Sequence, residues 1–239
     1  MSEAGRKQAI LTLALDLPSA DEALALADSL AALPLWFKVG LELFSAEGPA
    51  LVRAMTEREF AVFLDLKYHD IPNTVRGAVR SATRLGVRML SVHVTGGEAM
   101  CRAALAGRED ALGNGPGPLL MGITVLTSQS GDAADIRAQV VRLALAAKNC
   151  GLDGVVCSGW EAPAVKQACG DDFLCLCPGI RFAEHGDPGA LEDQARVCTP
   201  ARAVEQGADF LVMGRPVLRA ASPEAAARAA LEEMYKEKS

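Results

Sequence analysis

Residues 61–94, AVFLDLKYHDIPNTVRGAVRSATRLGVRMLSVHV, contain the unit that decides the fold. The apolar run Ala61–Lys67 has the character of a strand, and the run Met89–Val94 has the same character. Between them, Pro72–Leu85 has the composition of an amphipathic helix. A strand, a helix and a second strand in this order indicate a βαβ unit of a parallel sheet.

The same alternation recurs along the whole chain. We expect eight strands, about one for every 30 residues, which is the length of a βαβ repeat. They are Ala9–Asp16, Leu35–Gly40, Ala61–Lys67, Met89–Val94, Leu119–Leu126, Gly154–Ser158, Phe173–Cys177 and Asp209–Gly214. Helix-like stretches between them include Ala20–Leu33, Pro72–Leu85, Ala133–Cys150 and Pro223–Lys236.

Eight such units favour a single-domain α/β fold, a (β/α)8 TIM barrel, over residues 1–239. The main alternative is an open doubly wound sheet. That fold usually has a glycine-rich turn after its first strand, and residues 16–19, Asp-Leu-Pro-Ser, are not such a turn. No linker or low-complexity tract divides the chain, so we expect the barrel.

Composition and charge exclude several classes of protein. The chain has 239 residues, of which 50% are hydrophobic and 23% charged, with a net charge of −6. This composition is globular and too apolar for a disordered chain. The acidic balance argues against a nucleic-acid-binding protein. No apolar window approaches the length of a transmembrane helix.

The seven cysteines and three histidines predict neither a disulfide framework nor a metal site. The cysteines form no CxxC pair, and His69, His93 and His185 share no ligand spacing. The apolar run after Arg6 and Lys7 is short and ends at Asp16, so it indicates a first strand rather than a secretory signal. We therefore expect a cytoplasmic protein with reduced thiols.

Polar residues stand where the expected strands end. A barrel keeps its active site at the carboxyl ends of its strands, and ionisable groups are costly there unless they are paired or functional. The strand-end residues are Asp16, Lys38, Asp65, Lys67, His93, Thr127, Ser128, Ser158, Arg181 and Arg215.

The densest cluster is Asp65-x-Lys67-x-x-Asp70. Strand alternation places Asp65 and Lys67 on one face, with Leu64 and Leu66 facing the helices. Neighbouring carboxylates favour the charged ammonium form of Lys67, which suits an acid better than a Schiff-base amine. The alternative is a buried ion pair that only ties strand to helix.

The last quarter of the chain predicts an anion site. Cys177–Arg181 follows the seventh expected strand and Met213–Pro216 follows the eighth, and loops at these two positions frequently hold phosphate in barrels. The polar stretch 182–198 has the length of an active-site lid. The alternative for this stretch is a surface insertion.

The run Asp65-Leu-Lys67-Tyr-His-Asp70-Ile-Pro-Asn-Thr-Val closely resembles the signature of the orotidine 5'-phosphate decarboxylase family. Shorter motifs fall in the same order as in that family over nearly the whole chain. They are Leu-Ala-Leu-Asp16, Phe-Lys38-Val-Gly, Val-Leu-Thr127-Ser128, Pro178-Gly-Ile-Arg181, Asp-Gln194 and Gly214-Arg215-Pro.

The resemblance implies a cofactor-free, metal-free lyase. It would decarboxylate orotidine 5'-monophosphate to uridine 5'-monophosphate in de novo pyrimidine synthesis, by electrostatic stabilisation of a C6 carbanion. It also implies a homodimer with active sites at the interface. By that similarity Lys38, Asp65, Lys67 and Asp70 form a charged tetrad, in which Lys67 donates the proton to C6. Asp70 and Ile71 would enter the partner subunit's site.

The resemblance also assigns the substrate contacts. Asp16, Lys38 and Thr74 would lie at the ribose, and Thr127 and Ser128 at the pyrimidine. The remaining substrate-binding residues are Asp65 and Pro178, with the phosphate ligands Arg181, Gln194, Gly214 and Arg215, of which Gln194 is carried on the lid.

Two other functions are alternatives to this decarboxylase. A related sugar-phosphate decarboxylase or aldolase has its own Asp-x-Lys-x-x-Asp cluster but works through a Mg2+-stabilised enediolate. The extension His-Asp-Ile-Pro-Asn-Thr, residues 69–74, favours the nucleotide enzyme. A catalytically silent nucleotide-phosphate-binding protein would keep Arg181 and Arg215 but would not need Lys67 among carboxylates.

Overall fold

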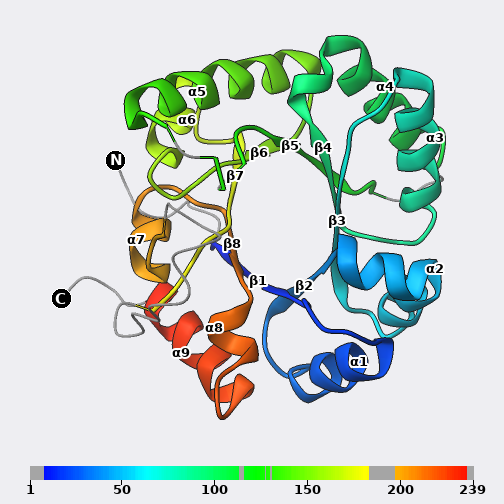
Figure 1. The fold of residues 1–239 in the computed structure, drawn as a ribbon, viewed down its shortest axis with the longest axis vertical. Coiled ribbons are helices and arrows are strands. Elements are labelled where there is room, and N and C mark those ends of the chain that lie inside the picture. Colours follow the sequence, from blue (N-terminus) through cyan, green and yellow to red (C-terminus); the bar gives the residue numbers. More distant parts are fainter. Residues whose placement is uncertain (1–7, 113–115, 127, 130, 183–196, 236–239) are drawn as a thin grey trace.

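The computed structural model describes residues 8–112, 116–126, 128–129, 131–182 and 197–235. Eight parallel strands close into a barrel in sequence order, with helices around the outside (Figure 1). The expected single-domain (β/α)8 barrel is confirmed. The strands are β1 (Ile10–Ala14), β2 (Leu35–Gly40), β3 (Ala61–Tyr68), β4 (Met89–His93), β5 (Leu119–Ile123), β6 (Gly154–Val156), β7 (Leu174–Cys177) and β8 (Phe210–Met213).

The helices follow the strands along the chain and pack against their outer faces (Figure 1). Within the described residues they are α1 (Ala20–Ser29), α2 (Leu41–Glu57), α3 (Pro72–Thr83), the 3-10 turn η1 (Val94–Gly96), α4 (Glu98–Glu109), α5 (Ala133–Cys150), α6 (Ala162–Cys169), α7 (Pro200–Glu205), α8 (Arg215–Leu218) and α9 (Pro223–Tyr235). No helix in this part of the chain is long and apolar enough to cross a membrane.

Local sequence signals set the helix ends. Asp132 caps α5, since its carboxylate accepts from the backbone N–H groups of Ala134 and Asp135. Gly151 ends the same helix in the left-handed conformation, with φ of 95°, which glycine adopts without steric cost. These two signals explain why α5 has the bounds that the sequence predicts.

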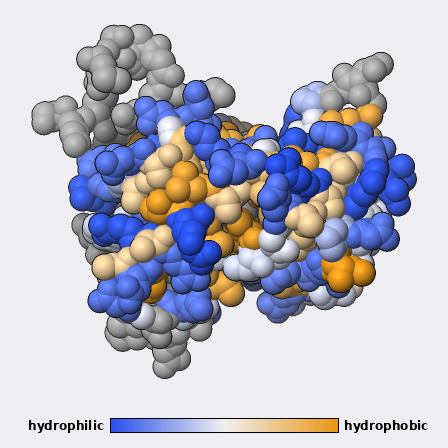
Figure 2. Space-filling view, turned by 90° about the horizontal axis from the view of Figure 1, so that it is seen from above, coloured by the Kyte–Doolittle hydropathy of each residue, from blue (hydrophilic) through white to orange (hydrophobic). Residues whose placement is uncertain are grey.

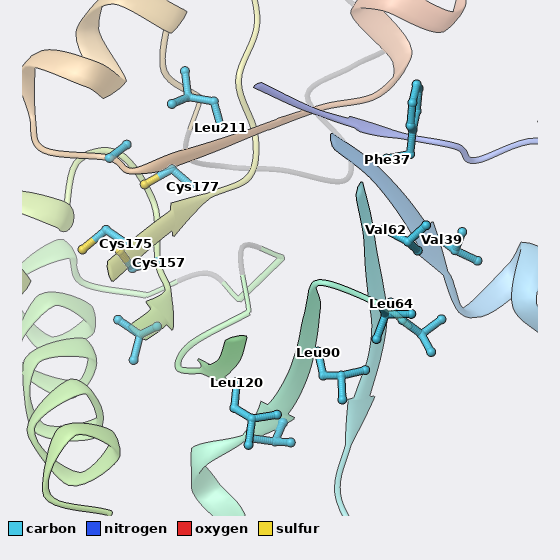
Figure 3. Packing of buried hydrophobic residues seen from close by; sticks show 14 of the residues in the cluster. Phe37, Val39, Val62, Leu64, Leu90, Leu120, Cys157, Cys175, Cys177 and Leu211 are labelled. Carbon is cyan, nitrogen blue, oxygen red and sulfur yellow. The ribbon is translucent and has the colours of Figure 1, made fainter. Parts of the chain in front are cut away.

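Alternation along the strands divides the core into two parts. An inner cluster fills the barrel and consists of Ala14, Phe63, Met89, Met121, Leu176, Phe210 and Val212. A larger outer cluster lies between strands and helices, and Figure 3 shows its members Leu64, Leu90 and Leu120 on β3, β4 and β5. Burial of both faces explains why the strands are near-continuous apolar runs.

The seven cysteines are all free and buried. Figure 3 shows Cys157, Cys175 and Cys177 close together, where they belong to the outer cluster at β6 and β7. Burial raises the pKa of Cys101 to about 12, so this thiol stays protonated. The thiols therefore act as small apolar groups in the core.

Two equivalent ion-pair clamps close the base of the barrel. Asp153, before β6, accepts from Arg108 Nη1 and from the backbone N–H of Leu120, each at 2.7 Å. Asp209, before β8, accepts from Lys166 Nζ and from the backbone N–H of Cys175, also at 2.7 Å. Each clamp ties a strand start to the preceding strand and to a helix. Both clamps lie at the amino ends of the strands, opposite the carboxyl ends where a barrel keeps its site.

The outer face of α5 carries an apolar groove. Figure 2 shows the molecule from above, where hydrophobic groups lie in several places among hydrophilic ones. Leu145 is 39% exposed in the α5 groove, which also includes Val141 and Arg137. This surface lies on the outside of the barrel wall.

Candidate active site

The carboxyl ends of the strands enclose a cavity of about 250 Å3. One part of its wall is charged and consists of Asp16, Lys38, Asp65, Lys67, Arg181 and Arg215. The other part is apolar and includes Phe63, Ile123, Val125, Leu126, Val156, Leu176 and Val212. A cavity with a few convergent charges on an otherwise apolar wall is typical of a small-molecule site.

Four charged side chains of alternating sign form a row on one side of this cavity. Lys38 Nζ lies 3.2 Å from Asp16 Oδ1 and 3.9 Å from Asp65 Oδ2. Lys67 Nζ donates to the same Asp65 Oδ2 at 2.7 Å. The side chain of Asp65 is only 10% exposed, so it is a largely buried carboxylate between two ammonium groups. Each of the two lysines therefore has a carboxylate partner inside the cavity.

The strand that carries Asp65 and Lys67 is irregular between them. Leu64 pairs with Leu90, but the next pair is Tyr68 with Val92, so the register of β3 against β4 shifts. Lys67 has φ of 50°, in the left-handed region where a residue with a side chain costs about 1–3 kcal/mol. The sequence predicted the shared face of Asp65 and Lys67 but not this bulge.

One β4 side chain compensates for the lost pairing. The backbone N–H of Lys67 donates to Ser91 Oγ at 2.9 Å, and that hydroxyl donates to Asp65 Oδ1 at 2.8 Å. Ser91 is completely buried. Both polar groups at the bulge are thereby satisfied, as buried polar groups generally are.

A pair of histidines lies beside the lysine end of the row. The rings of His69 and His93 stack with centroids 5.2 Å apart. Burial lowers the pKa of His93, and the nearby His69 and Lys67 lower it further, while Asp65 opposes them. His93 is therefore a neutral ring near neutral pH.

The two arginines of the cavity wall follow β7 and β8. The backbone N–H of Arg181 donates to the Cys198 carbonyl at 3.0 Å, and the Cys198 N–H donates to the Gly179 carbonyl at 3.2 Å. Gly179 has φ of 77°, which favours glycine. These bonds fix the turn that carries Arg181, while Gly214 precedes Arg215 at the start of α8. Two guanidinium groups on one wall suit a planar or tetrahedral anion.

The structure brings most of the predicted site residues together. Those that line the cavity are Asp16, Lys38, Asp65, Lys67, Pro178, Arg181, Gly214 and Arg215. Thr127 and Gln194 lie outside the described residues, as do residues 183–196 of the expected 182–198 lid. Ser128 is exposed and is not part of the cavity wall.

Three predicted residues at the start of α3 lie apart from the cavity. Asp70, Ile71 and Thr74 are not among its lining residues. Asp70 is exposed, and its Oδ1 accepts from the Ile71 N–H at 2.6 Å. The Ile71 side chain is 67% exposed, which is unusual for a large apolar residue. Within one chain, three members of the expected tetrad, Lys38, Asp65 and Lys67, therefore form a row with Asp16. The fourth member, Asp70, lies apart from it.

Sequence reasoning missed the apolar half of the cavity. Ile123, Val125 and Val156 were assigned to strands, and nothing in an apolar run tells which members face a cavity. The signal that exists is position, because each lies at or just beyond the carboxyl end of β5 or β6. Sequence reasoning also gave Ser91 no role.

Comparison with known proteins gives consistent results. Residues 9–230 match the family described as "Orotidine 5'-phosphate decarboxylase / HUMPS family". The chain is 53% identical over 230 residues to the orotidine 5'-phosphate decarboxylase of Nitratidesulfovibrio vulgaris, covering 94% of this chain and 97% of the relative. It is 48% identical over 234 residues to that of Moorella thermoacetica, covering 94% and 91% respectively.

A solved structure extends the likeness to three dimensions. The crystal structure of orotidine 5'-phosphate decarboxylase from Lactobacillus acidophilus superposes with a TM-score of 0.83 and 34% sequence identity. The match covers 96% of this chain and 100% of that one.

Proposed function

The chain belongs to the orotidine 5'-phosphate decarboxylase / HUMPS family, and from this premise we propose that it decarboxylates orotidine 5'-monophosphate to uridine 5'-monophosphate in de novo pyrimidine synthesis. One observation carries the proposal beyond family membership. The Lys67 ammonium lies 2.7 Å from the Asp65 carboxylate in a cavity that also holds Arg181 and Arg215. The cavity thus supplies a positioned acid and an anion site together.

The proposed decarboxylation requires a positively charged acid close to C6 of the substrate. When the bond from C6 to the carboxylate breaks, its electron pair stays on C6, where the ring offers no position to delocalise it. A preorganised positive charge lowers the energy of this developing carbanion. We assign that charge to Lys67, whose Nζ then gives a proton to C6 and recovers one from solvent. No metal or cofactor enters this sequence.

The neighbouring carboxylate contributes in two ways. Asp65 orients Lys67 by accepting a hydrogen bond from its Nζ at Oδ2. It would also lie near the carboxylate of the substrate, so that repulsion in the ground state disappears as CO2 leaves. We rank this second effect below carbanion stabilisation, since ground-state destabilisation is a contested contribution.

Further substrate contacts are proposed, some from position in the cavity and the others from the family resemblance alone. Asp16 and Lys38 form the ion pair at 3.2 Å that faces the ribose. Arg181 and Arg215 bind the phosphate, with Gly214 allowing close approach. Phosphate binding far from C6 supplies energy that offsets desolvation of the reacting centre. The other proposed binding residues are Thr74, Thr127, Ser128, Pro178 and Gln194.

We propose a homodimer in which each subunit completes the site of the other. Asp70 and Ile71 lie outside the cavity of their own chain and are exposed. In the partner's site, Asp70 would add a second carboxylate beside Lys67, and Ile71 would lose its exposure to water. The seven free thiols fit the reducing cytoplasm that we propose as the location.

The test is turnover of orotidine 5'-monophosphate by the purified protein in EDTA, followed by ultraviolet absorbance. Loss of substrate absorbance is expected. Turnover that fails in EDTA, together with Mg2+-dependent activity on a sugar phosphate, would contradict the proposal and favour the metal-dependent branch of the family. Binding of uridine 5'-monophosphate without any turnover would favour a silent binding protein.

A further inference from the structure

The bulge in β3 has a single residue of β4 opposite it. The pairs on either side are Leu64 with Leu90 and Tyr68 with Val92. Between them, residues 65–67 of β3 face only Ser91 of β4. Backbone ladder bonds cannot form for three residues against one, so the backbone at Lys67 needs another partner.

Ser91 supplies that partner and reaches a second group. A hydroxyl has one donor and two acceptor sites. Ser91 uses the acceptor for the Lys67 N–H at 2.9 Å and the donor for Asp65 Oδ1 at 2.8 Å. The other oxygen of Asp65 accepts from Lys67 Nζ at 2.7 Å. The backbone of Lys67, its own ammonium group and the Asp65 carboxylate therefore close into one ring of contacts through Ser91.

We propose that Ser91 is a positioning residue for the decarboxylation, one that holds the left-handed backbone of Lys67 and the carboxylate of Asp65 in a fixed relation. This inference rests on the proposed function. Lys67 has φ of 50°, a conformation that persists only where surrounding contacts hold it. Without the hydroxyl, the part-buried Lys67 N–H and one oxygen of the Asp65 carboxylate lose their partner. The backbone at Lys67 would then relax and move Lys67 Nζ away from the position that proton donation requires.

The proposed role of Ser91 is to orient the Lys67 side chain and not to bind the substrate. Ser91 is completely buried and does not line the cavity, so it does not reach the substrate. The ion pair of Lys38 with Asp16 and the two arginines are held by other strands and turns. Removal of the hydroxyl should therefore lower kcat and leave the affinity for uridine 5'-monophosphate unchanged.

The chain offers a matched control in Thr12. Thr12 lies on β1 between the inward-facing Ile10 and Ala14, and it is also completely buried. Its Oγ1 has no hydrogen-bond partner. Thr12→Val therefore removes a buried hydroxyl from the same barrel interior without removing a contact.

The experiment measures kcat, KM and calorimetric uridine 5'-monophosphate affinity for wild type, Ser91→Ala, Ser91→Thr and Thr12→Val. Ser91→Ala should lower kcat by about 10- to 100-fold, the loss typical of a misplaced reacting group. Its KM and product affinity should stay near wild type. Ser91→Thr, which keeps the hydroxyl, should recover most of the activity, and Thr12→Val should match wild type.

Several results would overturn the inference. They are a folded Ser91→Ala protein with wild-type kcat, a kcat loss as large in Thr12→Val, or a loss confined to product affinity. If Ser91→Ala does not fold, Ser91→Cys fills the same space with a weaker hydrogen-bonding group and should show the same kcat loss; wild-type kcat in that variant contradicts the inference. Failure of the proposed function is distinguishable, because it appears as a wild type that does not consume the substrate.

Discussion

Lys67 Nζ donates to Asp65 Oδ2 at 2.7 Å across a break in strand pairing. The two residues lie only two positions apart, so an unbroken strand would already place them on one face. The left-handed backbone of Lys67 also sets the direction in which its side chain leaves the strand. The Lys67 side chain is thus positioned by the fold before any substrate binds, as the proposed electrostatic preorganisation requires.

Arg215 is the group through which remote binding energy should reach the reaction. We predict that Arg215→Ala lowers kcat/KM by about 100-fold or more, since a charge-assisted contact to phosphate supports binding and rate together. Arg219→Ala is the matched control, because Arg219 is exposed in the same short segment and does not line the cavity. An unchanged kcat/KM in the Arg215 variant would remove the phosphate assignment.

Asp209 should matter for stability and not for catalysis. Asp209→Ala leaves the Lys166 ammonium without its carboxylate partner and the Cys175 N–H without an acceptor. We expect the free energy of unfolding in urea to fall by about 2–4 kcal/mol.

Glu224→Ala is the comparison for that clamp, because it breaks an exposed pair with Arg228 on α9. Its cost should be about 0.5 kcal/mol or less. Equal losses in the two variants would contradict the role given to the clamp.

His93 should make the protein less stable in mild acid. Burial lowers the pKa of His93 in the folded state, so the unfolded chain binds the proton more readily. The stability of the folded state is then complete above the unfolded value of about 6.5 and is lost as pH falls through the lower folded pKa. Between pH 7.5 and 5, the melting temperature of wild type should fall more than that of His93→Gln. Parallel curves would contradict this account.

The sequence predicted the barrel because the βαβ repeat is a local signal. The capping residues of α5, Asp132 and Gly151, are local signals too, and α5 has the predicted bounds. Strand ends were less predictable. The runs expected to end at Leu126 and Ser158 leave the sheet at Ile123 and Val156, since residues beyond those points line the cavity instead of pairing. In the sequence, an apolar residue that pairs in the sheet cannot be distinguished from one that lines the cavity.

The charged part of the site was predictable for a related reason. Ionised residues such as Asp65 and Lys67 seldom end an apolar run without a function, so their positions carried information. Ser91 carried none, because its importance depends on a bulge in the neighbouring strand. That irregularity arises from pairing between two segments and has no counterpart in the local pattern.

We assign to Lys67 both the stabilisation of the carbanion and the donation of the proton to C6. The most direct test compares wild type and Lys67→Ala for turnover of orotidine 5'-monophosphate in EDTA, with product affinity measured on both by calorimetry. We expect kcat to fall by at least about 1000-fold in the variant, while uridine 5'-monophosphate still binds. A Lys67→Ala protein that binds the product and keeps kcat within about tenfold of wild type would contradict it.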